Sequence, residues 1–203
     1  FLLESLHKKK GQNFINDYVA YTLESTKCIG LKVINAGGSE FFKQGGTVFN
    51  LDDVVPSYGV SSRQILKTLN QANEDLKIKH PIHVHCNNLG VPGNISTILD
   101  TINSAEGRRM HLAHVQFYGY DKKGKKGFSS GALELADAVN KNKNITVDVG
   151  QVMFTPTITI SSDILRQHGA RNNANPKKWV ISEIEDGGGG IIPYKYNRKN
   201  FVN

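Results

Sequence analysis

Three side chains that can bind a metal ion lie on three successive apolar segments of the chain. Lys32 stands inside the run 29–34, and His85 and His114 lie towards the carboxyl ends of the runs 82–86 and 110–117. A lysine buried in such a run is costly as an ammonium ion unless it is paired or neutral. A neutral lysine amine can react with carbon dioxide to form a carbamate, an anion that can bridge two metal ions roughly 3.5–4 Å apart. The alternative is that the stem of Lys32 packs while its ammonium reaches the strand end.

Four histidines lie on the predicted strands, and their positions along the strands indicate which two are metal ligands. His83 and His85 are two residues apart and should face the same side, whereas His111 and His114 are three apart and should face opposite sides. Active sites of barrel enzymes lie at the carboxyl ends of the strands. We therefore predict that His85 and His114 are ligands and that His111 is structural. Neutral imidazole is the commonest protein ligand for zinc.

Polar groups follow His85 directly. The chain leaves the strand at Cys86-Asn87-Asn88-Leu89-Gly90, so Asn87 and Asn88 are predicted to bind substrate. Hydrogen bonding within the loop is an equally good interpretation of these two residues. Asp148 ends the next apolar segment, and we expect it to be structural or to support a ligand.

The elements that position these residues alternate between strand and helix. Strands are predicted at 29–34, 82–86, 110–117 and 145–153, and helices at 11–26, after a Ser61–Gln64 capping box, after Asn94, and from Ser129 or Ser130. This order predicts an α/β fold with a parallel sheet and helices outside. A complete (β/α)₈ TIM barrel needs about 250 residues, so four units predict a partial barrel. Residues 153–203 do not continue the alternation of strand and helix and are predicted to be an insertion-like excursion.

Composition narrows the class of protein. The chain has 203 residues, 38% hydrophobic and 21% charged, which is typical of a folded domain. Its formal charge of +7 is scattered in small groups, which argues against a nucleic-acid binder. Two cysteines form no disulfide framework and fit a reducing compartment. The first residue is Phe1, and we expect the chain to be an internal segment of a longer polypeptide.

The candidate ligands resemble those of the amidohydrolase superfamily. Its metal ligands are a His-x-His pair on strand one, a carboxylated lysine on strand four, histidines on strands five and six, and an aspartate on strand eight. Lys32, His85 and His114 match the middle three in order. A closer resemblance is to the family of the formylmethanofuran dehydrogenase A subunits, over roughly residues 20 to 200. The segments that carry it are 30–38, 81–90, 111–117, 147–152 and 190–194.

The resemblance implies a fold and a site. Residues 1–203 would be the central part of a metal-dependent amidohydrolase-type barrel, about strands four to seven. Lys32 would be the carboxylated bridging ligand of two zinc ions, with His85 and His114 on one of them. The strand-one pair would precede Lys32, and the proton-transfer aspartate would lie beyond residue 203.

The resemblance also implies an activity and partners. In a cytoplasmic complex, other formylmethanofuran dehydrogenase subunits, with a tungsten or molybdenum pterin and iron–sulfur clusters, would reduce carbon dioxide to formate. The amidohydrolase-type barrel would condense formate with the methanofuran amine, or hydrolyse formylmethanofuran, and Asn87 and Asn88 would bind formate or the amide. Two alternatives stay open: a stand-alone cyclic amidohydrolase of the hydantoinase or dihydroorotase type, and a degenerate barrel kept as a scaffold.

Overall fold

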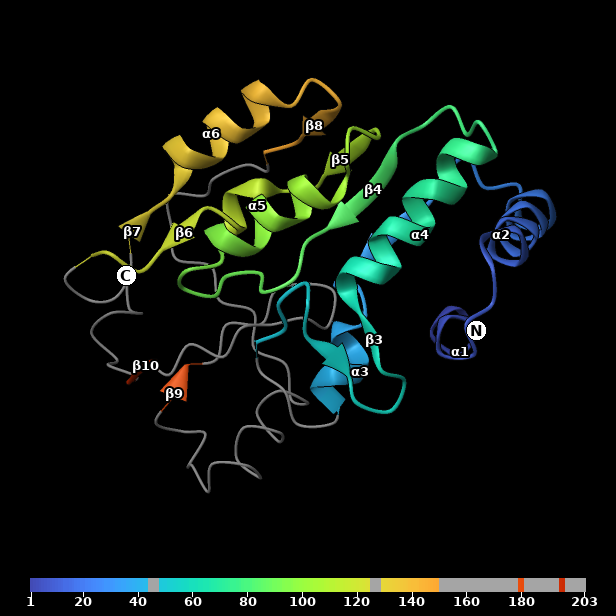
Figure 1. The fold of residues 1–203 in the computed structure, drawn as a ribbon. Coiled ribbons are helices and arrows are strands. Elements are labelled where there is room, and N and C mark those ends of the chain that lie inside the picture. Colours follow the sequence, from blue (N-terminus) through green and yellow to red (C-terminus); the bar gives the residue numbers. More distant parts are fainter. Residues whose placement is uncertain (44–47, 125–128, 150–178, 181–193, 196–203) are drawn as a thin grey trace.

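A four-stranded parallel sheet is the centre of the fold (Figure 1). The computed structural model describes residues 1–43, 48–124, 129–149, 179–180 and 194–195. The sheet order is β1 (Lys32–Ile34), β4 (Ile82–His85), β5 (Met110–Leu112) and β8 (Ile145–Val147), so the strands lie in the order of the chain. The prediction of an α/β fold with a parallel sheet is confirmed.

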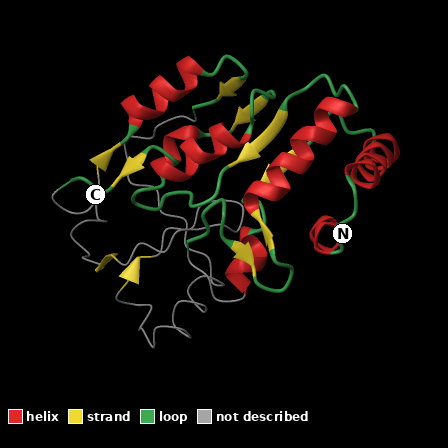
Figure 2. Ribbon diagram, in the orientation of Figure 1, coloured by secondary structure: helices red, strands yellow, loops and turns green. Residues whose placement is uncertain are grey.

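The structure describes six helices, of which α4, α5 and α6 cover one side of the sheet. They are α1 (Leu2–His7), α2 (Gln12–Thr26), α3 (Gly38–Lys43), α4 (Ser62–Asp75), α5 (Ile95–Ser104) and α6 (Ala132–Lys141). Helices α4, α5 and α6 lie side by side along the sheet, and α2 packs against α4 (Figure 2). Short antiparallel pairs join β2 (Val54–Val55) to β3 (Val60–Ser61), β6 (Tyr120–Asp121) to β7 (Ser129–Ser130), and β9 (Trp179–Val180) to β10 (Tyr194–Lys195).

The strands have one apolar face and one polar face. Val33, Val84 and Leu112 are buried and belong to the core that contains side chains of α4 and α5. Side chains alternate along a strand, so the neighbouring residues point the other way. We call this second side the histidine face and define it by Lys32, His83, His85, His111 and Thr146. Apart from His85, these residues are half-buried or exposed.

Several local predictions are confirmed. The helix predicted at 11–26 is α2, and α4 begins with the predicted capping box, in which Gln64 N–H donates to Ser61 Oγ and Ser61 N–H donates to Gln64 Oε1. Asn94 precedes α5 as predicted, but its side chain does not cap the helix. It donates instead to the carbonyls of Asn88 and Phe117, because these pack directly against it.

Other predictions require correction. Residues 35–58, where the sequence predicts no helix or strand, contain α3 and β2. The strand predicted over 110–117 ends at Leu112 and is followed by a 3₁₀ turn, η1 (Val115–Phe117). Of the predicted excursion 153–203, all but 179–180 and 194–195 lies outside the described residues.

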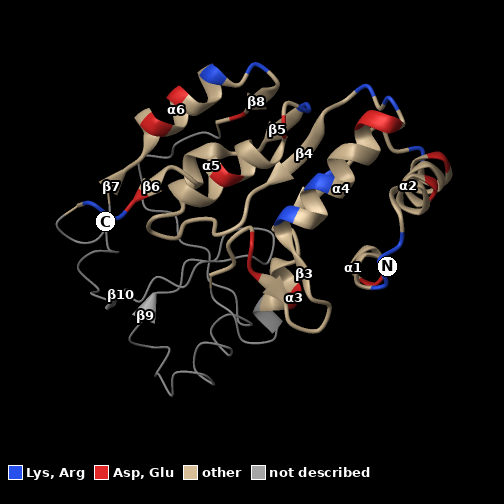
Figure 3. Cartoon of the chain, in the orientation of Figure 1, with Lys and Arg blue, Asp and Glu red and all other residues tan. Residues whose placement is uncertain are grey.

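The charged residues of the described elements are scattered, as the sequence indicates. Lysine, arginine, aspartate and glutamate are spread over several elements (Figure 3). None of the described helices is both long enough and apolar enough to cross a membrane.

Cys86 provides a simple test of the packing. It is 3% exposed directly after β4, and burial raises the pKa of its thiol to about 12. The thiolate is the reactive form of cysteine. At neutral pH, the fraction of Cys86 present as thiolate should be about a thousandfold smaller than for an ordinary thiol. We expect iodoacetamide to label the exposed Cys28 readily and Cys86 only after unfolding, as followed by peptide mass spectrometry. Equal labelling of both thiols in the folded protein would contradict this packing.

Candidate metal centre at the carboxyl ends of the strands

His85 and His114 meet beyond the ends of their strands. Nδ1 of His85 and Nε2 of His114 are 2.6 Å apart, and the ring centroids are 4.5 Å apart with the rings inclined at 72°. His85 is the last residue of β4 and is buried, and His114 follows β5. Two imidazole nitrogens that point at one another can share a proton, or can both bind one metal ion if the rings separate to about 3.3 Å. This geometry agrees with the sequence prediction that the two side chains lie together, and their role as metal ligands stays a prediction.

His114 reaches His85 because the chain turns sharply. Its backbone is left-handed, with φ 36° and ψ 54°, which costs a non-glycine residue about 1–2 kcal/mol. The carboxylate of Asp148 accepts the His114 N–H at 2.6 Å. The backbone of Asp148 also binds the chain on both sides of His114, because its N–H donates to Leu112 O and its carbonyl accepts from Val115 N–H. These bonds hold the turn in place.

The turn overturns one prediction about the histidines. The prediction that His111 and His114 face opposite sides assumes that the strand continues through His114. Strand β5 instead ends at Leu112. Instead, four imidazoles follow one another: the ring centroids of His111 and His83 are 4.9 Å apart, and those of His83 and His85 are 5.2 Å apart. His114 continues this row beyond His85. The expectation that only one of His111 and His114 can look to this side is therefore wrong.

Lys32 lies on the histidine face, but it is not buried as predicted. In the sheet register it is the partner of His83, and Ile34 is the partner of His85. Lys32 is exposed because, in the described residues, β1 is covered by the core on one face only. Burial lowers the pKa of His83, and the positive charges of His111 and Lys32 lower it further. Lys32 is therefore close enough to His83 to act on it electrostatically.

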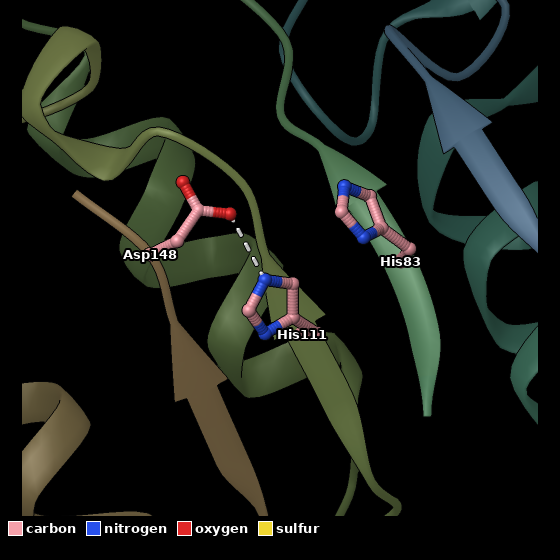
Figure 4. A group of neighbouring side chains, drawn as sticks. All are labelled: His83, His111 and Asp148. Carbon is pink, nitrogen blue, oxygen red and sulfur yellow. Dashed lines mark hydrogen bonds and ion pairs between the residues drawn. The ribbon is translucent and has the colours of Figure 1, made fainter. Parts of the chain in front are cut away.

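A second group of side chains that could bind a metal ion lies beside the first (Figure 4). One ligand atom from each of His83, His111 and Asp148 lies within 4.8 Å of the others. Nε2 of His111 is 3.0 Å from Asp148 Oδ2, and Nδ1 of His111 is 2.9 Å from Thr146 Oγ1. Although burial opposes it, hydrogen bonding to His111 and to the His114 backbone holds the pKa of Asp148 below its usual range.

This second group does not follow from the sequence. Judged alone on their strands, His111 and Asp148 are predicted to be structural or supporting residues. The missing information is the register, which pairs His83 with His111 and His111 with Thr146. The spacing of His83 and His85 does carry a signal, since two histidines on one strand face are uncommon in a core.

Asn87 and Asn88 use their side chains to hold the neighbouring loop. Asn87 donates to Phe49 O at 3.1 Å and to Ser62 Oγ at 2.5 Å. Asn88 accepts from Phe49 N–H at 2.8 Å and donates to Thr97 Oγ1 at 3.0 Å. These hydrogen bonds support the interpretation that both side chains stabilise the loop. That they also bind substrate stays a prediction.

Replacing Asn88 with alanine should destabilise the fold. The buried Phe49 N–H would lose its acceptor, and alanine tolerates the φ of +60° at this position less well than asparagine. We expect the free energy of unfolding to fall by about 3 kcal/mol. Urea denaturation measures the change, with the exposed Asn103→Ala in α5 as a control expected to stay within about 0.5 kcal/mol. Equal stability of the two variants would show that the Asn88 contacts are dispensable.

Comparisons with known proteins agree on one group of relatives. No protein-family profile matches the chain. It is 45% identical over 206 residues to the A subunit of the formyltransferase/hydrolase complex Fhc of Methylorubrum extorquens, covering 99% of this chain and 38% of that protein. It is 36% identical over 197 residues to "Protein FwdA" of Methanocaldococcus jannaschii, covering 91% of this chain and 35% of that protein.

A solved structure gives the same result. The crystal structure of the formyltransferase/hydrolase complex FhcABCD from Methylorubrum extorquens, in complex with methylofuran, matches with a TM-score of 0.75 and 47% identity over 96% of this chain. The chain spans little more than a third of the length of each of these relatives. Over nearly its whole length, it is homologous to the A subunit of the formyltransferase/hydrolase complex and to FwdA.

Proposed function

We propose that this chain forms part of an amidohydrolase-type (β/α)₈ barrel in a formylmethanofuran dehydrogenase-like enzyme. The barrel would carry a metal centre that condenses formate with the amine of a methanofuran-type coenzyme, or hydrolyses the formyl amide. The observation that carries the proposal is the pair of facing nitrogens of His85 and His114, in a chain homologous to components of such complexes. The four parallel strands of the sheet are compatible with half of such a barrel.

The donor set fits zinc. His85 and His114 each offer a ring nitrogen at the carboxyl ends of adjacent parallel strands, where barrel enzymes have their active sites. Lys32, as a carbamate, would bridge two zinc ions from β1. Zinc bound there would supply a nucleophilic water of lowered pKa and would polarise the formyl carbonyl. Both histidines must be neutral to act as ligands.

The other residues would prepare the site for the substrate. Asp148 holds the left-handed turn that aims the His114 ring at His85. Asn87 and Asn88 hold Phe49 against the strand end and would bind formate or the formyl amide at that edge. The aspartate that takes the proton from the attacking water would lie beyond residue 203.

We also propose the setting of the enzyme. It would work in the cytoplasm, beside partner subunits with a tungsten or molybdenum pterin and iron–sulfur clusters that supply formate. The FhcABCD complex, which was crystallised with methylofuran, supports a complex of several different polypeptides and a coenzyme of this kind.

Native purification tests the proposal. The full-length protein should copurify with its partners, contain zinc, and release formate from the formylated coenzyme. A protein that purifies alone and opens hydantoin or dihydropyrimidine rings, but leaves the formylated coenzyme intact, would show that it is a stand-alone cyclic amidohydrolase. A zinc-free protein without either activity would indicate a scaffold.

A further inference from the structure

His83 and His111 of the histidine face converge with Asp148 at a point beside the His85–His114 pair. His83 comes from β4, His111 from β5, and Asp148 follows β8. Their ligand atoms lie within 4.8 Å of one another, and Figure 4 shows the rings and the carboxylate turned towards a common space. Neither His83 nor His111 has a role in the proposed function.

The distances suit a small divalent cation. Ligand atoms at about 2.0–2.2 Å from zinc in a tetrahedral site are about 3.3–3.6 Å from one another. His111 Nε2 and Asp148 Oδ2 are 3.0 Å apart, close to this separation. The 4.8 Å limit for the group means that the His83 ring would have to move by no more than about 1.5 Å, which a side-chain rotation can supply.

The surroundings of His111 also suit a ligand. A histidine that binds a metal through one ring nitrogen usually donates its other N–H to an oxygen, which fixes the tautomer. Nδ1 of His111 is 2.9 Å from the hydroxyl oxygen of Thr146, so Nε2 would be left for the cation. Asp148 would bring the negative charge. Lys32, the register partner of His83, would oppose a cation as an ammonium ion and favour it as a carbamate.

We propose that His83, His111 and Asp148 bind one divalent cation of the zinc type, distinct from the metal proposed at His85 and His114. Two imidazoles and one carboxylate form a common zinc ligand set that leaves a fourth position for water. Thr146 orients His111 from outside the ligand set. This inference does not depend on the proposed function, because its two histidines have no role in that function and it needs no substrate, although Asp148 also holds the turn at His114.

Metal titration of the full-length protein tests the inference. The protein is stripped with a chelator, reloaded with Co²⁺ or Zn²⁺, and analysed by elemental mass spectrometry and by the Co²⁺ absorption spectrum. His83→Gln and His111→Gln should each lose one metal equivalent and one set of Co²⁺ bands, whereas His114→Gln should lose a different equivalent. Thr146→Val should weaken the affinity of the first site by about 10–100-fold.

The outcomes separate this inference from the proposed function. Full metal content and an unchanged spectrum in His83→Gln, His111→Gln and Thr146→Val would overturn the second site, whatever His114→Gln does. Loss in His111→Gln but not in His114→Gln would support the second site and count against the proposed function. Thr146→Val removes no ligand, so it keeps the test valid if the histidine variants fail to fold, as monitored by circular dichroism.

Discussion

Replacing His114 with alanine is expected to lower the turnover of the formylated coenzyme by about a thousandfold or more. A bound metal contributes several kcal/mol to stabilising the transition state, and each 1.36 kcal/mol or so is worth a factor of ten. His114 would supply one of the two facing ring nitrogens, so its loss should cost the metal as well as the activity. Steady-state kinetics and zinc analysis of the same sample measure both effects.

The matched control for His114→Ala is His80→Ala. His80 is exposed and its side chain lies outside the histidine face, so this variant should keep wild-type zinc content and turnover. A His114 variant that keeps its zinc and more than a tenth of its turnover would exclude the ring as a ligand.

Replacing Lys32 with methionine is expected to lower turnover by about a hundredfold to a thousandfold. The change keeps much of the apolar stem and removes the amine that would carry the carbamate, and with it the anion proposed to bridge two zinc ions. Because Lys32 is exposed on the histidine face, its replacement should leave the fold intact. Turnover and zinc content are measured together, and native mass spectrometry of the wild type should show the added mass of carbon dioxide.

Lys79→Met is the control for the charge change. Lys79 is also exposed, and the contact it makes to Arg109 uses its backbone carbonyl. This variant should behave like the wild type. Loss of activity in Lys79→Met to the same extent would mean that net charge, rather than the Lys32 amine, is responsible.

The regular part of the fold was predictable because its signals are local. The spacing of apolar residues and the Ser61–Gln64 capping box identify α2 and α4, and short branched runs identify the strands. The early end of β5 was not predictable in this way. It depends on bonds from Asp148 to the chain around His114, across 34 residues of sequence. The apolar character of 110–117 reflects burial of Val115 and a half-buried Phe117 in the 3₁₀ turn as much as strand structure.

The candidate site was predictable in part for the same reason. The residue types and their positions at the carboxyl ends of the strands were enough to predict that His85 and His114 lie together. The partnership of His83, His111 and Asp148 depends on the register between three strands, which no single segment encodes. The exposure of Lys32 depends on what covers the second face of β1, and an apolar run alone does not determine that.

Anomalous diffraction at the zinc absorption edge tests the central claim most directly. Crystals of the full-length protein grown with zinc should show an anomalous peak about 2.0–2.1 Å from both Nδ1 of His85 and Nε2 of His114. The two nitrogens would then lie about 3.3 Å apart, farther than the 2.6 Å of a direct contact. A direct hydrogen bond between the two rings, with no peak beside them, would contradict the account.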